Sequence, residues 1–337
     1  MNLYHTMSIH KLITIFALAL VFSCKMNEDQ KPSTIVEEEK GGIDINTLPK
    51  FNSDSAYAFV AAQVAFGPRV PNSEGHAQCA AWMIALLKSY ADTVVVQKAD
   101  LKAFDGKILH AKNIIASFNP QSETRVMLSA HWDTRPFADQ DSKDQDKPID
   151  GANDGASGVG ILLEIARAYS IQKPNIGVDI ILWDAEDYGQ PADSKFPEME
   201  DSYCLGSQYW AKNMHRPNYS AKWGILLDMC GALGASFSKE QQSVKFAGNL
   251  VDRTWQNAQT LGYSSIFLQE YGNAIIDDHY YINTLAHIPT IDIIEYDPAT
   301  QAFGPYWHTH DDSMDVIDRN TLEVVGRTVL EVVWKER

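Results

Sequence analysis

Acidic and imidazole side chains follow several apolar segments of this sequence, and their types could bind a metal ion. The heptapeptide WDAEDYG, residues 183–189, places Asp184, Glu186 and Asp187 at the end of the apolar run VDIILW. Carboxylates are costly at the end of a buried strand unless a cation or hydrogen-bond donors meet them there. Taken alone, these three carboxylates could equally be solvated loop charges, so other segments have to distinguish the two interpretations.

Four further segments carry Asp, Glu or His directly after an apolar run or at the start of a helix. They are AHWDT (130–134), DGANDGASGVG (150–160), LLDMCG (226–231) and EYDPATQAFGPYWHTHDD (295–312). Their donors are oxygen and imidazole nitrogen, and the three cysteines after residue 24 have no zinc-thiolate spacing. This donor set favours a catalytic zinc site with an open coordination position over a closed structural one.

The elements that would position these side chains alternate between helix and strand. Helical periodicity is found at about 53–65, 73–90, 157–169, 206–214, 246–261 and 320–334. Strand patterns are found at 93–99, 112–118, 126–130, 178–183, 223–228 and 288–294. Continuously apolar strands separated by helices predict an α/β domain with a largely parallel sheet covered on both faces. Ligands of such sheets bind beyond the carboxyl ends of the strands, where the acidic segments are expected.

Composition excludes some classes of protein. The chain has 337 residues, of which 45% are hydrophobic, and a formal net charge of -16. These values are typical of a globular protein. The charge argues against a nucleic-acid partner, which would require basic surface.

The amino-terminal segment indicates export. After His10 and Lys11, the run LITIFALALVF is too short to span a bilayer but suits the apolar part of a signal peptide. It ends at Ser23-Cys24, which resembles the lipidation site of bacterial lipoproteins; a plain secretory signal is the alternative. We predict a signal peptide at 1–24, a flexible tether at 25–44 and one domain at 45–337, in the periplasm or anchored to a membrane through Cys24.

The order of these motifs resembles that of the zinc aminopeptidase superfamily over about residues 50–335. Within it the sequence is similar to the glutaminyl cyclases of animal type, on AHWDTRPFAD (130–139), IIDDHYYI (275–282) and the tryptophan before the late histidine. The resemblance implies a single domain with a mixed, mostly parallel sheet between helices. It also implies conversion of the N-terminal glutamine of peptides and proteins to pyroglutamate, with release of ammonia.

The resemblance further implies the residues of the site. One zinc ion per chain would be held by Asp154, Asp187 and His308, with Asp187 standing where the animal enzymes have the longer glutamate. Glu186 would move protons as base and then acid, and Asp228 and Asp277 would form an acidic hydrogen-bonded network.

The same resemblance implies a pocket for the glutamine side chain. Trp307, Phe303 and Ile276 would contact this side chain. The animal enzymes have another tryptophan in the segment that reads GQPA at 189–192 here, so Trp210 or Trp132 is a candidate for the opposite wall.

Two other functions stay open at this point. If His131, Asp154 and Asp228 hold a second zinc ion, the protein is an aminopeptidase that activates a bridging water. A non-catalytic binding lipoprotein of the envelope is the other alternative, although every position that the chemistry requires is filled.

Overall fold

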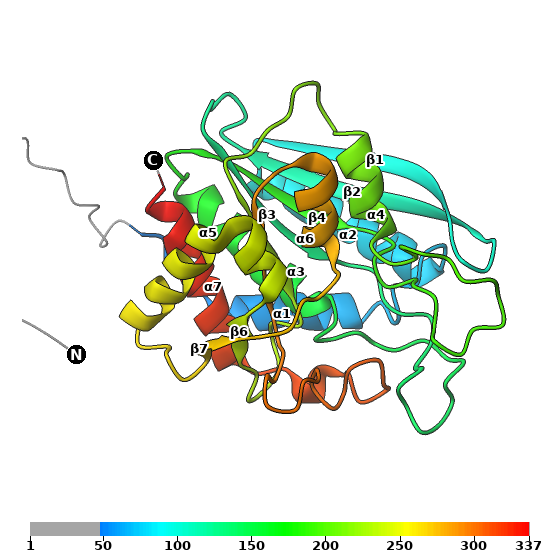
Figure 1. Ribbon diagram of the computed structural model, residues 1–337. Helices are drawn as coiled ribbons and strands as arrows, with labels where there is room; N and C mark the ends of the chain where they lie inside the picture. Colours follow the sequence, from blue (N-terminus) through cyan, green and yellow to red (C-terminus); the bar gives the residue numbers. More distant parts are fainter. Residues whose placement is uncertain (1–47, 337) are drawn as a thin grey trace, which may run out of the picture. The chain divides into compact units, whose positions relative to one another are not determined.

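A six-stranded sheet forms the centre of the fold, with its strands in the order β1-β2-β4-β3-β5-β8 (Figure 1). The computed structural model of the protein describes residues 48–336; the predicted signal peptide, the predicted anchor at Cys24 and the tether lie outside the described residues. The strands of this sheet are β1 (Thr93–Lys102), β2 (Ile108–Phe118), β3 (Arg125–His131), β4 (Gly177–Trp183), β5 (Gly224–Asp228) and β8 (Thr290–Ile294).

The sheet is mixed, as expected. Strands β4, β3, β5 and β8 pair in parallel, whereas β2 is antiparallel to β4 and to β1. The four parallel strands are buried over their whole length, which explains their continuous apolar sequences. The β1–β2 hairpin turns at Gly106, whose φ of 85° is accessible to glycine at little cost.

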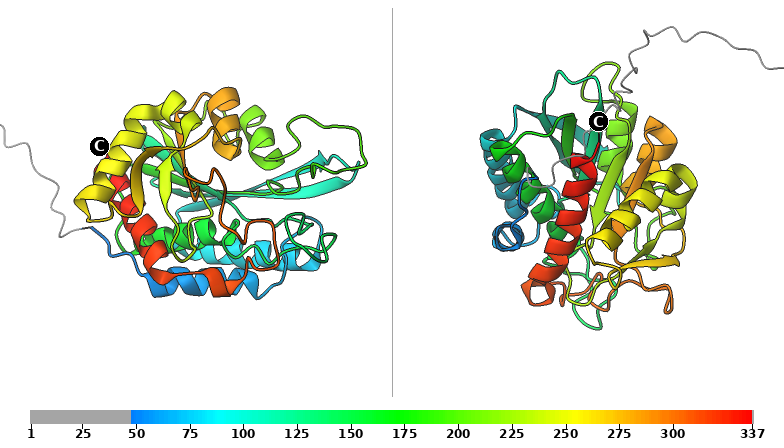
Figure 2. Two further views of the ribbon diagram at one scale, coloured as in Figure 1. Left: turned by 60° about the horizontal axis from the view of Figure 1, so that its bottom comes forward. Right: turned by 90° about the vertical axis from the view of Figure 1, so that its left-hand side faces the viewer.

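Helices cover both faces of the sheet (Figure 2). Helices α1 (Ser53–Val64), α2 (Glu74–Tyr90), α3 (Ala156–Ile171) and α7 (Arg319–Trp334) pack on one face. Helices α4 (Leu205–Lys212) and α6 (Asp278–Tyr281) lie over the other face, and α5 (Gln241–Thr260) packs against β8 at the edge. This arrangement confirms the predicted α/β class with its central sheet between helices.

Local sequence explains where the helices begin. The Ser73 hydroxyl accepts a hydrogen bond from the His76 backbone N–H at 3.1 Å, so Ser73 is the N-cap of α2. Helix α5 begins at Gln241, five residues before the predicted start at 246, because the Glu240 carboxylate accepts hydrogen bonds from the first N–H groups of the helix.

Several short elements do not follow from the sequence pattern. They are the strands β6 (Phe237–Lys239) and β7 (Phe267–Tyr271), helix α6, the π-helical turn Ile282–Ala286 and the 3₁₀ turn Met314–Val316. Each is too short for a hydrophobic period to distinguish it from a loop. Within residues 48–336, no helix is long and apolar enough to cross a membrane.

Candidate active site

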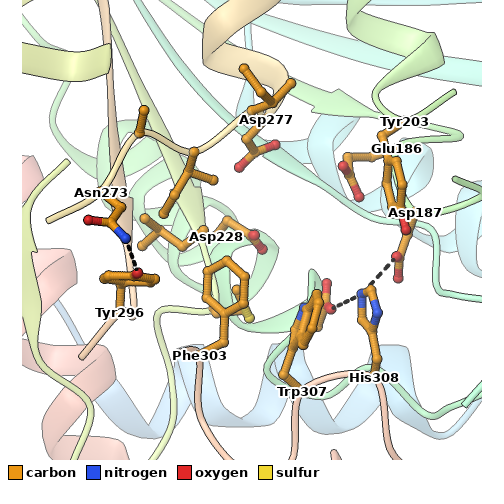
Figure 3. A pocket seen from close by; sticks show the side chains of 16 residues that line it. Glu186, Asp187, Tyr203, Asp228, Asn273, Asp277, Tyr296, Phe303, Trp307 and His308 are labelled. Carbon is orange, nitrogen blue, oxygen red and sulfur yellow. Dashed lines mark hydrogen bonds and ion pairs between the residues drawn. The ribbon is translucent and has the colours of Figure 1, made fainter. Parts of the chain in front are cut away.

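All nine predicted site residues line one cavity of about 410 Å³ beyond the carboxyl ends of the parallel strands (Figure 3). Glu186 and Asp187 follow β4, and Asp228 is the last residue of β5. Asp154 comes just before α3, whereas His308 lies in the loop after β8. The other residues of the predicted set are Asp277, Ile276, Phe303 and Trp307. The rule that ligands bind at this end of a parallel sheet therefore holds for this fold.

Asp154, Asp187 and His308 form a group that could hold a metal ion, since their ligand atoms lie within 4.8 Å of one another. His308 Nε2 lies 3.4 Å from Asp187 Oδ1 and 3.7 Å from Asp154 Oδ2. Asp187 Oδ2 is buried and has no hydrogen-bond partner within residues 48–336. A carboxylate with one unpartnered oxygen, next to an imidazole, suits zinc, which binds both donor types.

Two residues whose roles the sequence did not reveal support this group. Asp139 Oδ1 lies 3.3 Å from His308 Nδ1, the nitrogen that faces away from the cluster. Such a carboxylate fixes the orientation of a metal-binding imidazole. The Arg135 guanidinium donates to both oxygens of Asp139, at 2.6 and 2.9 Å, and to the backbone carbonyl of Asp187 at 3.0 Å. Both residues belong to the motif AHWDTRPFAD (130–139), so membership of this motif was the sequence feature that could have indicated their role.

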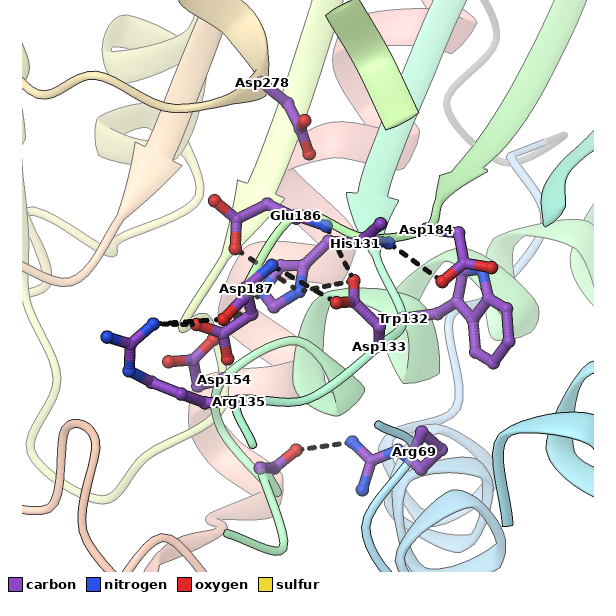
Figure 4. Close-up of polar contacts among 12 residues, drawn as sticks. Arg69, His131, Trp132, Asp133, Arg135, Asp154, Asp184, Glu186, Asp187 and Asp278 are labelled. Carbon is purple, nitrogen blue, oxygen red and sulfur yellow. Dashed lines mark hydrogen bonds and ion pairs between the residues drawn. The ribbon is translucent and has the colours of Figure 1, made fainter. Parts of the chain in front are cut away.

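Backbone hydrogen bonds hold the loop of Glu186 and Asp187 in place (Figure 4). The Asp133 carboxylate accepts from the N–H groups of Glu186, at 3.0 Å, and of Asp187, at 3.2 Å. Asp184 points elsewhere, because His76 Nε2 lies 2.9 Å from its carboxylate. Two of the three carboxylates of this loop therefore reach the cavity, and the third makes a buried contact with the His76 imidazole.

Glu186 has a hydrogen-bond donor of its own in Cys204, whose Sγ lies 3.2 Å from Glu186 Oε1. Burial raises the pKa of Cys204 well above its usual value, so the thiol keeps its proton and donates it. Burial also raises the pKa of Glu186, despite His131, and the neighbouring carboxylates of Asp187 and Asp277 raise it further. A carboxyl group with a raised pKa is suited to exchanging protons near neutral pH.

Asp228 and Asp277 extend the acidic cluster. Burial raises the pKa of Asp228 to about 7, although His131 opposes the shift. Burial likewise raises the pKa of Asp277, whose Oδ2 is buried and has no hydrogen-bond partner within the described residues. Carboxyl groups in such a cluster share protons, so the cavity is not fully ionised without a cation.

His131 belongs to a second group that could hold an ion. Its Nε2 lies 2.9 Å from Asp154 Oδ1 and 3.1 Å from Asp228 Oδ1, and the ligand atoms of the three residues lie within 4.8 Å of one another. Burial lowers the pKa of His131, but Asp133, Asp154 and Asp228 together raise it well above its usual value. The three residues that the aminopeptidase alternative requires for a second ion are thus also close together.

Aromatic rings form one wall of the cavity. The Trp307 ring stacks on His308 with centroids 3.8 Å apart, and Phe303 lies 4.8 Å from Trp307. Ile276 is 50% exposed at the mouth of the cavity.

The prediction that Trp210 or Trp132 forms the opposite wall of the cavity is wrong. Trp132 and Trp210 are fully buried in the protein interior, where Trp132 stacks on His76 and Trp210 packs against Trp183. Neither lines the cavity, whereas Tyr203 does. Both tryptophans are large apolar groups at a sheet–helix interface, so packing there buries them away from the cavity.

The chain belongs to peptidase family M28, which it matches over residues 113–333. Among solved structures, it is 52% identical to a glutaminyl cyclase from Tannerella forsythia, with a TM-score of 0.84, over 86% of this chain and 100% of that one. A Zn-dependent exopeptidase from Parabacteroides distasonis is similar at 51% identity and a TM-score of 0.84, over the same shares of the two chains. The fold and the resemblance to glutaminyl cyclases are thereby confirmed.

Relatives from other organisms include both an aminopeptidase and a glutaminyl-peptide cyclotransferase. The chain is 25% identical to the aminopeptidase YwaD of Bacillus subtilis, over 80% of this chain and 54% of that protein. It is 26% identical to the glutaminyl-peptide cyclotransferase of Bos taurus, over 65% of this chain and 64% of that protein. The match therefore spans less than two thirds of each relative.

Proposed function

We propose that the protein is a zinc-dependent glutaminyl cyclase, which converts the N-terminal glutamine of peptides and proteins to pyroglutamate with release of ammonia. The observation that carries the proposal is the position of Glu186. Its carboxylate lies in the same cavity as the metal-ligand group Asp154, Asp187 and His308 and as the acidic side chain of Asp277. Identity to a glutaminyl cyclase at about half of the aligned positions supports the same function.

The charge of the cavity suits a peptide amino terminus. Five carboxyl groups line it: Asp154, Glu186, Asp187, Asp228 and Asp277. They attract the α-ammonium group of a peptide and disfavour a substrate with an acidic first side chain. A neutral glutamine side chain is compatible with this charge, and the aromatic wall of Trp307 and Phe303 offers apolar contact to its methylene groups.

Glu186 moves the proton that the reaction requires. It takes a proton from the α-ammonium group, whose nitrogen then attacks the side-chain amide carbon. A C–N bond forms to close the five-membered lactam, and the bond from that carbon to the amide nitrogen breaks. Glu186 returns this proton to the leaving nitrogen, which departs as ammonia, and then takes the second proton that the ring nitrogen loses and releases it to solvent. Because the nucleophile belongs to the substrate itself, correct positioning supplies much of the acceleration.

The roles of the other polar groups follow from their contacts. Asp228 and Asp277 hold the amino group by hydrogen bonds, and Cys204 keeps one oxygen of Glu186 in place. One zinc ion, bound by Asp154, Asp187 and His308, would polarise the amide oxygen as a Lewis acid.

We further infer that the protein is exported. The proposal rests on the apolar run and the Ser23-Cys24 sequence near the amino terminus, with a lipid at Cys24 as the membrane attachment. Labelling with a radioactive fatty acid tests it: Cys24→Ala should abolish incorporation, and equal incorporation in the variant would contradict the anchor.

A direct assay tests the catalytic proposal. The purified domain is incubated with a glutaminyl peptide and with a leucyl peptide, and zinc per chain is counted by elemental analysis. Ammonia release from the first peptide, an intact second peptide and one zinc per chain are the expected results. Release of free leucine with two zinc ions per chain would instead establish the second candidate.

That second candidate is a two-zinc aminopeptidase. It is favoured by one specific observation, the intact group of His131, Asp154 and Asp228. His131→Ala distinguishes the candidates, because a cyclase with one zinc ion keeps its metal stoichiometry in this variant and an aminopeptidase with two loses one ion.

A further inference from the structure

The cavity has aromatic side chains on two sides, and the second side belongs to Tyr203. This residue comes just before α4, and its ring lines the cavity together with Glu186 and Asp187. Figure 3 shows Tyr203 beside these two carboxylates, away from the side that carries Phe303 and Tyr296. A group that enters the cavity would therefore pass between Tyr203 and the wall formed by Phe303 and Trp307.

The Tyr203 ring is fixed by neighbours from two other segments. The guanidinium carbon of Arg135 lies 5.3 Å from the ring centroid, a distance typical of a cation–π contact. The ring also lies against the backbone of Gly189. A Cβ atom at position 189 would lie 2.2 Å from three ring carbons, far closer than van der Waals contact allows.

The ring of Tyr203, and not the backbone conformation of residue 189, therefore explains why this position is a glycine. Its φ is outside the left-handed region, so alanine could adopt the same backbone conformation. What excludes a side chain here is the space that Tyr203 occupies. Because this ring lines the cavity, an added methyl group at position 189 would displace it from its place in the cavity wall.

The hydroxyl of Tyr203 makes no hydrogen bond to residues 48–336. Arg135 and Gly189 hold the side chain in place through contacts with its ring. Burial raises the pKa of Tyr203, so the side chain stays neutral. A neutral ring offers a flat apolar surface next to a cluster of carboxyl groups. A planar, uncharged amide can pack against such a surface.

We propose that Tyr203 forms the second wall of the pocket for the first side chain of the substrate, and that Gly189 is required to leave room for its ring. This inference rests on the proposed function in that the side chain is taken to be that of glutamine. Tyr203 would thus supply a specificity-determining contact that none of the tryptophans supplies on this side.

The test combines substitutions at the two positions. Tyr203→Ala removes the wall and should raise KM for a glutaminyl peptide roughly tenfold, the size expected from one aromatic contact, with a smaller change in kcat. Tyr203→Phe keeps the ring and should restore KM to within about twofold of the original value. Gly189→Ala displaces the ring and should also raise KM.

A double substitution separates this mechanism from general damage. If Gly189 acts through the ring, Gly189→Ala should have no further effect once Tyr203→Ala has removed the ring. Gly248→Ala is the matched control, since a Cβ at position 248 meets no atom within 4 Å. Zinc content and the thermal midpoint are measured for each variant to show that it is folded and loaded.

Two results would overturn the inference. One is an unchanged KM for folded, zinc-loaded Tyr203→Ala; the other is an effect of Gly189→Ala that persists in full in the double variant. If Tyr203→Ala does not fold, Tyr203→Leu and Gly189→Ala provide the same comparison. The leucyl peptide is assayed in parallel. Cleavage of this peptide by the unmodified protein would refute the cyclase proposal. In that case, the KM of the variants for the leucyl peptide still tests the role of Tyr203.

Discussion

Asp133 and Asp312 hold two loops of the cavity in the same way. Each carboxylate accepts hydrogen bonds from two consecutive backbone N–H groups. Asp133 binds those of Glu186 and Asp187, at 3.0 and 3.2 Å, and Asp312 binds those of Asn153 and Asp154, at 2.7 and 3.0 Å. Two of the proposed zinc ligands are therefore positioned by carboxylates that do not bind the ion themselves.

We expect Asp312→Ala to lower zinc affinity by about 10–100-fold, the usual cost of losing a residue that orients a ligand. Without the Asp312 carboxylate, the loop that carries Asp154 loses two hydrogen bonds and can move. Competition with a fluorescent chelator measures the affinity. Asp311→Ala is the control because that neighbour is exposed; equal affinities in the two variants would refute the role of Asp312.

Glu186→Gln should reduce turnover by about 10²–10⁴-fold while the metal stays bound, since the amide keeps the shape of the side chain but cannot accept the proton. Ammonia release and zinc content are measured on the same sample. Glu198→Gln, at an exposed position of the following loop, is the control. Turnover that survives in Glu186→Gln would remove this residue from proton transfer.

Removal of the metal should make stability fall as pH rises. In the metal-free chain, burial raises the pKa of Asp187 to about 6 and that of Asp228 to about 7. The unfolded chain releases these protons near pH ~4. The folded state holds protons that the unfolded state has lost, so the contribution to stability is complete below about pH 4 and disappears as pH rises through the folded values.

Thermal midpoints with and without a chelator measure this effect. From about pH 5 to about pH 8, the midpoint of the metal-free protein should fall, whereas zinc compensates the charge of the ionised carboxylates and reduces the slope. Asp228→Asn should flatten the slope of the metal-free protein. A midpoint that rises over the same range would contradict the raised pKa values.

Arg125→Met should destabilise the fold by about 3–5 kcal/mol, because it leaves a buried carboxylate without its cation. Arg125 Nη1 lies 3.0 Å from Asp179 Oδ1, and both side chains are buried at the amino ends of β3 and β4. Urea denaturation measures the change. Replacing Asp179 by leucine in the same chain should recover part of the loss.

The exposed pair of Arg319 and Asp54 provides the control for this experiment. Its atoms lie 2.8 Å apart, but both side chains are more than half exposed. Arg319→Met should therefore cost less than about 1 kcal/mol. A loss as large as that of Arg125→Met would mean that burial does not determine the strength of these pairs.

Sequence patterns predicted the long elements well and the short ones poorly. Helices α2 and α7 and the parallel strands lie within a few residues of their predicted bounds, since a strong apolar period or run marks each of them. The strands β6 and β7 and helix α6 carry no such period. They depend on contacts with distant segments, as when the Glu240 side chain accepts from the Ile275 backbone N–H.

The amino-acid sequence by itself determined the donor types and their order along the chain. The alternation of helical periods with apolar runs also determined the α/β fold. Together they predict a cavity lined by Asp, Glu and His at the carboxyl ends of parallel strands, because side chains that follow neighbouring parallel strands meet at one edge of a sheet.

Only the tertiary structure decided which side chains face the cavity. Asp184 and Asp187 are three positions apart in one loop, yet Asp184 turns to His76 from another helix while Asp187 joins His308. Tyr203, and neither tryptophan, lines the side away from Phe303. Such choices depend on partners that lie more than a hundred residues away, as with Asp184 and His76, and on packing that no local pattern of residues contains.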